Sequence, residues 1–157
     1  MRNAIIGGFI GSALTALISL AIYSSRPSQA AGPQTYLSVE DTREVTRVVM
    51  VATMVYEFKP TATDNELKTY WLEGSQADMS VRDWLTDLKK IQTAGNLGDP
   101  TGKINDVTLY QGGYAQVSMK EQLPNRRQVL YRTLYLVKEK NKWLIYRTSG
   151  LPDLNGF

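Results

Sequence analysis

The 157-residue chain contains no cysteine and no histidine. The absence of cysteine excludes disulfide bonds and thiol chemistry, and the absence of both excludes zinc sites built from their side chains. Nucleophilic catalysis by a Ser-His or Cys-His pair is excluded as well. The sequence therefore carries no catalytic signature, and it indicates no cofactor and no metal site.

Charge is nearly balanced beyond the first thirty residues. Residues 31–157 carry 16 basic and 15 acidic side chains, but residues 31–100 hold 7 basic and 11 acidic ones, whereas residues 101–157 hold 9 and 4. The basic residues are scattered along the strands and turns predicted below, as on a solvated sheet. This distribution does not favour nucleic acid as a partner.

The first part of the chain reads as a membrane-directed segment. Residues 4–23 are uncharged and lie between Arg2 and Arg26, and a helix of that length spans about 30 Å, the thickness of a bilayer core. We expect residues 1–25 to be an anchor or signal segment and residues 26–37 a linker. The charge pattern predicts a single-pass inner-membrane protein with a cytoplasmic N-terminus and an extracytoplasmic domain at residues 38–157.

Two alternatives remain open for this segment. If it is a cleaved signal peptide, Ser28-Gln29-Ala30 would supply the small residues at the cleavage site. If it is retained, Gly7, Gly11 and Thr15 form a small-residue face on which membrane helices could pack closely.

Three capping patterns predict three amphipathic helices before any strand. Ser38 with Asp41, Thr63 with Glu66, and Ser80 with Asp83 each place an acidic residue three positions after a hydroxyl. Pro60, Gly74 and Gly95 are the corresponding stops. The first helix carries a broad apolar stripe of Val45, Val48, Val49, Ala52 and Val55.

In the second half of the chain, apolar and polar residues alternate with the two-residue period of strands. Apolar residues at 107 and 109 and at 115, 117 and 119 flank Gly112-Gly113, which predicts a hairpin with a glycine turn. Residues 127–148 form a second, long hairpin around the charged turn at residues 139–142. Four strands in series predict an antiparallel meander with the three helices packed on one of its faces, an α+β fold.

This order of elements resembles the nuclear transport factor 2-like α+β cone, over about residues 38–150. The resemblance rests on helices before strands and on the closing Val-Lys-Glu-Lys-Asn-Lys-Trp-Leu-Ile-Tyr hairpin at residues 137–146. With the N-terminal anchor, the chain resembles the inner-membrane bitopic assembly subunit of bacterial type IV secretion and conjugation systems. That resemblance implies self-association and contacts with other channel subunits. The chain departs from that family by a shorter N-terminal segment and by residues Asn96-Leu97-Gly98-Asp99-Pro100 in place of an Asn-Pro-x-Gly turn.

Arg132 lies within an apolar row of Leu130, Leu134 and Leu136. On a buried face Arg132 would need an acidic partner, whereas on an open face the four residues would have the composition of a protein interface. We predict the interface, with the helices packed on the opposite face, which carries Val129, Tyr131, Tyr135 and Val137.

A catalytic reading would use the ligand cavity found in some relatives of this fold. Its candidates are Tyr110, Tyr131, Tyr135 and Tyr146 with Arg132, and Asp106 as the base. Tyrosines at alternate strand positions are more often cross-strand packing pairs. The sequence thus predicts a non-enzymatic, membrane-anchored assembly subunit of an envelope-spanning secretion or conjugation machine that binds itself and other envelope proteins through its sheet. The alternative is a secreted periplasmic domain that binds or isomerises a small apolar ligand in a cone pocket.

Overall fold

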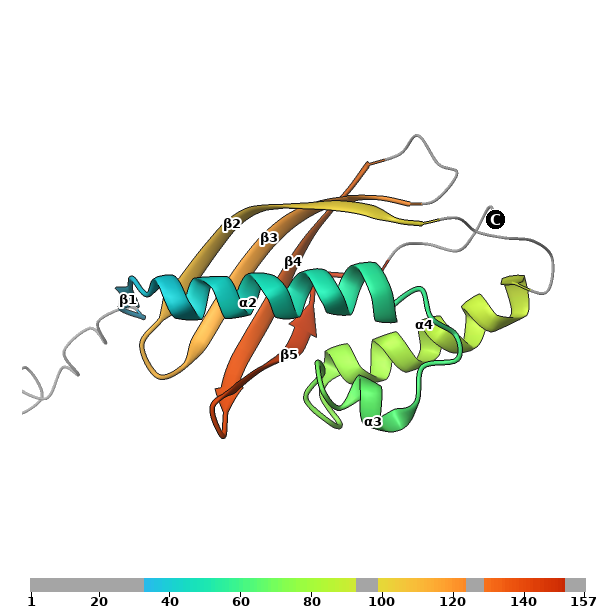
Figure 1. Ribbon diagram of the computed structural model, residues 1–157, viewed down its shortest axis with the longest axis horizontal. Coiled ribbons are helices and arrows are strands. Elements are labelled where there is room, and N and C mark those ends of the chain that lie inside the picture. Colours follow the sequence, from blue (N-terminus) through green and yellow to red (C-terminus); the bar gives the residue numbers. More distant parts are fainter. Residues whose placement is uncertain (1–32, 93–98, 124–128, 152–157) are drawn as a thin grey trace, which may run out of the picture. The chain divides into compact units, whose positions relative to one another are not determined.

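A computed structural model describes residues 33–92, 99–123 and 129–151, which all fall within one compact unit, Pro33–Phe157. This unit is an α+β domain (Figure 1). Its elements are β1 (Thr35–Tyr36), α2 (Val39–Val51), the π-helical segment η1 (Ala52–Tyr56), α3 (Asp64–Leu67), α4 (Gln76–Gln92), β2 (Thr101–Tyr110), β3 (Tyr114–Gln122), β4 (Val129–Glu139) and β5 (Lys142–Thr148).

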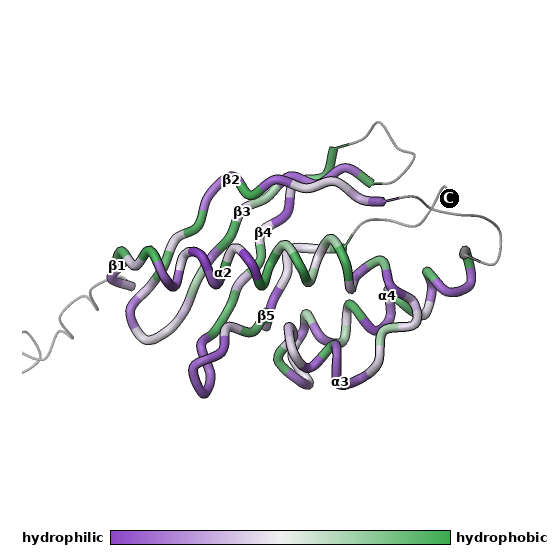
Figure 2. Tube along the Cα trace, viewed as in Figure 1, coloured by the Kyte–Doolittle hydropathy of each residue, from purple (hydrophilic) through white to green (hydrophobic). Residues whose placement is uncertain are grey.

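The sheet has five antiparallel strands in the order β1-β2-β3-β4-β5. Both predicted hairpins are confirmed. Gly112 and Gly113 turn the chain with positive φ between β2 and β3, and Lys140 and Asn141 do so between β4 and β5, at a hydrophilic tip (Figure 2). In the two-residue turn between β4 and β5, positive φ at both central residues is the signature of the hairpin turn that matches strand twist.

The prediction of four strands is wrong because β1 adds a fifth. It lies inside the predicted linker, where Thr35 pairs with Tyr110 and Tyr36 with Leu109. Two residues are too short to show an alternating pattern. This strand therefore forms only because the rest of the sheet offers it an edge.

The helices cover the face of the sheet that carries Arg132, Leu134 and Leu136 (Figure 1). Leu134 and Leu136 are fully buried and belong to one apolar core with residues of α2 and α4. The prediction that the helices cover the opposite face is therefore wrong. The side chains of the core are Val45, Val48, Val49, Ala52, Leu67, Trp71, Ala77, Val81, Trp84, Leu85, Leu88, Leu109, Ala115, Val117, Met119, Leu134, Leu136, Trp143 and Ile145.

The first helix follows the predicted stripe only as far as Ala52. The side-chain hydroxyl of Thr53 then donates to the carbonyl of Val49 (2.8 Å), and the amide of Glu57 donates to the carbonyl of Ala52 (3.0 Å), five residues back. This wider turn admits one extra residue, which shifts the buried side of the helix. As a result Val55 is 51 % exposed, and Glu57 is buried instead.

The three capping predictions have different outcomes. Thr63 and Glu66 form the reciprocal capping box of α3. Ser38 accepts from the amide of Asp41 (3.1 Å), but the Asp41 carboxylate bonds elsewhere. The third prediction is wrong, because α4 begins at Gln76, where the Ser75 hydroxyl accepts from the amide of Asp78 (3.2 Å).

The prediction of a transmembrane helix and of a single-pass inner-membrane location needs correction. No helix among the residues that the structure describes is long and apolar enough to cross a membrane. The segment at residues 4–23, with Gly7, Gly11 and Thr15, lies outside the described residues.

Candidate functional site

The open face of the sheet is the candidate site. Side chains alternate between the faces of a strand, so the burial of Leu134 and Leu136 under the helices turns Tyr135 to the other face. The same register turns five tyrosines to this open face, and among its side chains Tyr131 is 72 % exposed, Tyr114 48 % and Val129 42 %. The five are Tyr110, Tyr114, Tyr131, Tyr135 and Tyr146.

Three of these rings form a tyrosine cluster, defined here as Tyr114, Tyr135 and Tyr146. The ring centre of Tyr146 lies 6.5 Å from that of Tyr114 and 6.5 Å from that of Tyr135. An irregularity in the β4–β5 register after Tyr135 brings Tyr146 and Arg147 to the same part of the face, and the Arg147 guanidinium lies 5.6 Å from the centre of the Tyr135 ring. The cluster is thus a continuous aromatic surface with a cation at its edge.

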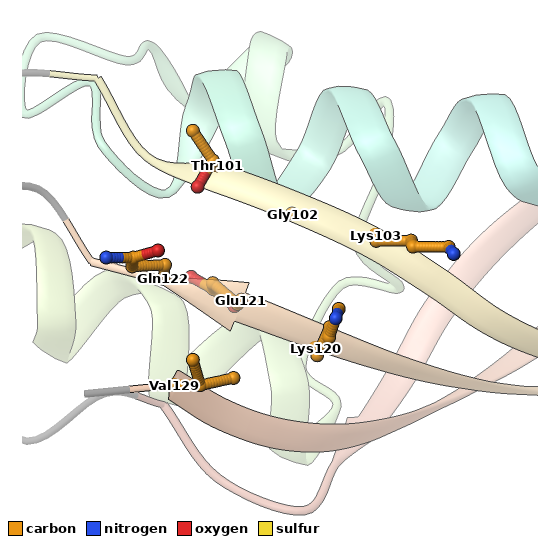
Figure 3. A pocket seen from close by; sticks show the side chains of 7 residues that line it. All are labelled: Thr101, Gly102, Lys103, Lys120, Glu121, Gln122 and Val129. Carbon is orange, nitrogen blue, oxygen red and sulfur yellow. The ribbon is translucent and has the colours of Figure 1, made fainter. Parts of the chain in front are cut away.

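The other end of the open face carries a basic hollow. Lys103 of β2 lies directly opposite Lys120 of β3, which lies opposite Tyr131 of β4. Both lysines line a hollow of about 290 Å³ (Figure 3), whose other lining residues are Thr101, Gly102, Glu121, Gln122 and Val129. Like charges that face each other across strands are destabilising. Within the described residues, neither lysine forms an ion pair that would relieve this repulsion.

On the covered face, Arg132 lies at the centre of a buried charge cluster. Its guanidinium donates to both carboxylate oxygens of Glu57 (2.7 and 3.0 Å), to Glu121 (3.0 Å) and to the hydroxyl of Thr148 (3.2 Å). The side chains of Arg132 and Glu57 are each 1 % exposed, and that of Glu121 is fully buried. A planar guanidinium satisfied by two carboxylates is the arrangement that makes a buried Arg tolerable.

The cluster holds two carboxyl groups but only one cation. Burial raises the pKa of Glu121 above its usual value, Arg132 lowers it, and the negative charge of Glu57 raises it further; the net direction is upward. Burial alone would lower the pKa of Arg132, but Glu57 and Glu121 together raise it above its usual value. Glu121 Oε1 and Arg132 Nε have no hydrogen-bond partner in the described part of the chain. The surroundings of Glu121 therefore favour its protonated form.

The residues predicted as an interface are not on the open face. Arg132, Leu134 and Leu136 are buried inside the domain, and Leu130 is half-buried beside them. Of the two predictions made for Arg132, the structure agrees with the one that places it on a buried face, where it requires acidic partners. Glu57 and Glu121 are those partners.

The structure does not bring the catalytic candidates together. Tyr110, Tyr131, Tyr135 and Tyr146 lie on the open face, whereas Arg132 lies on the covered one, so the sheet separates them. Asp106 is exposed and accepts from the hydroxyl of Thr108 (2.9 Å). A second hollow of about 400 Å³ lies along α4, lined by Leu67, Arg82 and Leu85 among others, and neither hollow lies between the sheet and α2. Among the described residues no cluster of Asp or Glu could hold a metal ion.

The sequence contained a signal for one of the missed acidic residues. Ala115, Val117 and Met119 are buried at alternate positions of β3, and Glu121 is the next residue in that alternation. The sequence thus placed an acid on an apolar strand face. Glu57 had no such signal, because the π-helical turn moves it into a position that regular helical spacing assigns to solvent.

A comparison of the chain with protein-family models finds no match, and comparisons with curated proteins and with solved structures find none either.

Proposed function

We propose that this domain is a non-enzymatic assembly module that binds proteins through the open face of its sheet, with a second copy of the chain on the tyrosine cluster. The observation that carries the proposal is the set of five tyrosines on a face that no described element covers. Tyrosine is enriched at protein interfaces because its ring buries a large apolar area while its hydroxyl keeps a hydrogen bond.

The charge around the tyrosine cluster suits a second copy. The cluster is uncharged, and its neighbour Arg147 already lies against the Tyr135 ring. Two copies related by a two-fold axis could bury these uncharged rings against each other, with the Arg147 of each copy at the edge of the contact. The basic hollow, by contrast, would repel its own copy.

The resemblance described above supplies the wider setting of the proposal. It implies a subunit of a secretion or conjugation machine that associates with itself and with other subunits. An uncovered aromatic sheet face supports such an assembly role, since assembly needs a surface and no chemistry.

A ligand-binding or isomerase function has less support. The space beneath β4 is occupied by Arg132 with its two glutamates and by Met119 and Leu134. The tyrosines that would line a cone pocket face the other way. Both terminal nitrogens of the Arg132 guanidinium already donate to carboxylates of the cluster.

The proposal is tested by sedimentation velocity of the full chain over a dilution series. We expect the wild-type chain to self-associate, and a Tyr114→Glu change to abolish that association because it places a charge in the aromatic contact. Met79→Glu is the matched control, since Met79 of α4 is exposed to a similar extent, 56 % against 48 %, but lies on a helix. The proposal is wrong if the wild-type chain is monomeric, or if both variants associate as the wild type does.

A further inference from the structure

The two edges of the sheet differ in how well they are covered. At the β5 edge, the backbone at Ile145 pairs with Tyr70 and Leu72 (2.8 and 2.9 Å), and the amide of Thr148 donates to the side chain of Gln76 (2.9 Å). At the opposite edge, β1 pairs only with Leu109 and Tyr110 of β2. From Thr101 to Thr108, no strand among the described residues pairs with the outer edge of β2 (Figure 1).

The neighbouring chain does not continue along this edge. β1 ends at Tyr36, and Ser38 already caps α2, so the chain leaves the sheet after pairing with the last two residues of β2. An uncovered edge of this length presents unpaired backbone donors and acceptors, which another extended segment can satisfy. Within the residues that the structure describes, this length of edge has no strand beside it.

The side chains along the edge indicate what that segment must carry. Lys103 and Lys120 face each other on the open face, and within the described part of the chain neither has a carboxylate partner; Lys103 is on the edge strand itself. On the covered face, Ile104 and Val107 are only half-buried and pack at the margin of the core. A strand placed beside β2 would thus put alternate side chains next to lysine and next to apolar surface.

A bulge between Ile104 and Asp106 refines this pattern. The extra residue brings Asp106 to the same face as Lys103, although three positions separate them. The open face of the edge consequently offers a positive position followed by a negative one. An incoming strand is favoured where it places an acid beside Lys103 and a neutral or basic residue beside Asp106.

We propose that an extended segment of a partner protein adds to the Thr101–Thr108 edge of β2 as a further strand, with an acidic residue beside Lys103 and apolar residues at alternate positions. The proposal does not depend on self-association through the tyrosine cluster, because it concerns a different surface. Such an acid would supply Lys103 with a counter-ion, which it lacks among the described residues.

The first test measures charge recognition by fluorescence polarisation with the full chain. The probe is a labelled peptide that alternates valine with threonine around a central glutamate, and a second probe has lysine in its place. We expect the glutamate probe to bind, and Lys103→Glu to weaken it by about tenfold and to favour the lysine probe. Lys142→Glu is the matched control, because Lys142 is also exposed at a strand end but lies on β5. The proposal fails if the glutamate probe does not bind, or if both variants weaken it equally.

The second test separates strand addition from a purely electrostatic contact. Two versions of the glutamate probe carry N-methyl groups on alternate residues, so that each version blocks the amides along a different edge of the peptide. A paired strand uses only one of its edges toward β2. We expect one version to bind and the other not, while equal binding or equal loss overturns the proposal. Tyr114→Glu should leave probe binding unchanged, which distinguishes failure here from failure of the tyrosine interface.

Discussion

Replacement of Arg132 by methionine isolates the energetic role of the buried charge cluster. The change removes a guanidinium that makes hydrogen bonds to Glu57, Glu121 and Thr148. It leaves two buried carboxyl groups without a cation. Removing one partner of a buried ion pair costs about 3–5 kcal/mol, because the remaining charge has lost both water and its counter-charge.

This cost is large compared with the whole stability of a domain, which is typically about 5–15 kcal/mol. Since each kcal/mol lowers the melting temperature of a domain of this size by about 4 °C, we expect Arg132→Met to lower it by about 12–20 °C. Urea unfolding followed by tryptophan fluorescence measures the change in free energy directly, because Trp71, Trp84 and Trp143 are all buried.

Two controls test whether the loss of stability in Arg132→Met comes from the unpaired carboxyl groups. Adding Glu57→Leu and Glu121→Leu to Arg132→Met removes the charges left behind, and such apolar replacements are often neutral or stabilising by about 1–4 kcal/mol. We therefore expect the triple variant to recover most of the loss. The cost of Arg132→Met should also shrink at acidic pH, where the stranded carboxyl groups take up protons. A single variant that loses less than about 1 kcal/mol, or a triple variant no better than the single one, would refute the argument.

Three further predictions concern other parts of the domain. Burial and the charge of Glu57 raise the folded-state pKa of Glu121 above 4.5. The protonated Glu121 therefore stabilises the fold below pH 4.5, and this stabilisation is lost as the pH rises through the folded-state pKa. In urea titrations, the free energy of unfolding of Glu121→Gln should accordingly increase relative to that of the wild type from acidic to neutral pH. The hydrogen bond from Lys138 lowers the pKa of Asp41 below 3.8. Asp41→Asn should therefore lower the free energy of unfolding by about 1–2 kcal/mol at neutral pH, and by less as the pH falls below 3.8, as measured by thermal unfolding. Asn141 has a φ of 64°, so Asn141→Gly should stabilise the hairpin by up to about 1 kcal/mol, whereas an unchanged melting temperature would contradict this account of the turn.

Local patterns in the sequence were sufficient to predict the α+β class, both hairpins and the start of α2 and α3. Each depends on residues close together in the chain, such as Gly112-Gly113 or Thr63 with Glu66. The start of α4 was assigned too late, because Ser80 with Asp83 and Ser75 with Asp78 show the same spacing. Only the packed structure distinguishes two such patterns that lie five residues apart.

The face of β4 could not be predicted, because both faces of this strand are apolar in sequence. The structure buries the face on which Arg132 contacts Glu57, and these two residues are 75 positions apart in the sequence. That pairing depends on the π-helical turn, which single-sequence periodicity does not reveal. With the face reversed, the candidate interface moved from the leucine row to the tyrosines.

The π-helical turn also determines which changes of chain length the first helix can accept. Ala52–Tyr56 contains one residue more than a regular α-helical turn needs. Deletion of the exposed Val55 would restore ordinary helical spacing while Glu57 still faces Arg132. The same deletion within Val39–Val51 would rotate everything that follows by about 100° and turn Glu57 away from the guanidinium. Related chains that keep the buried ion pair are thus expected to vary in length by a single residue at this turn and not earlier in the helix.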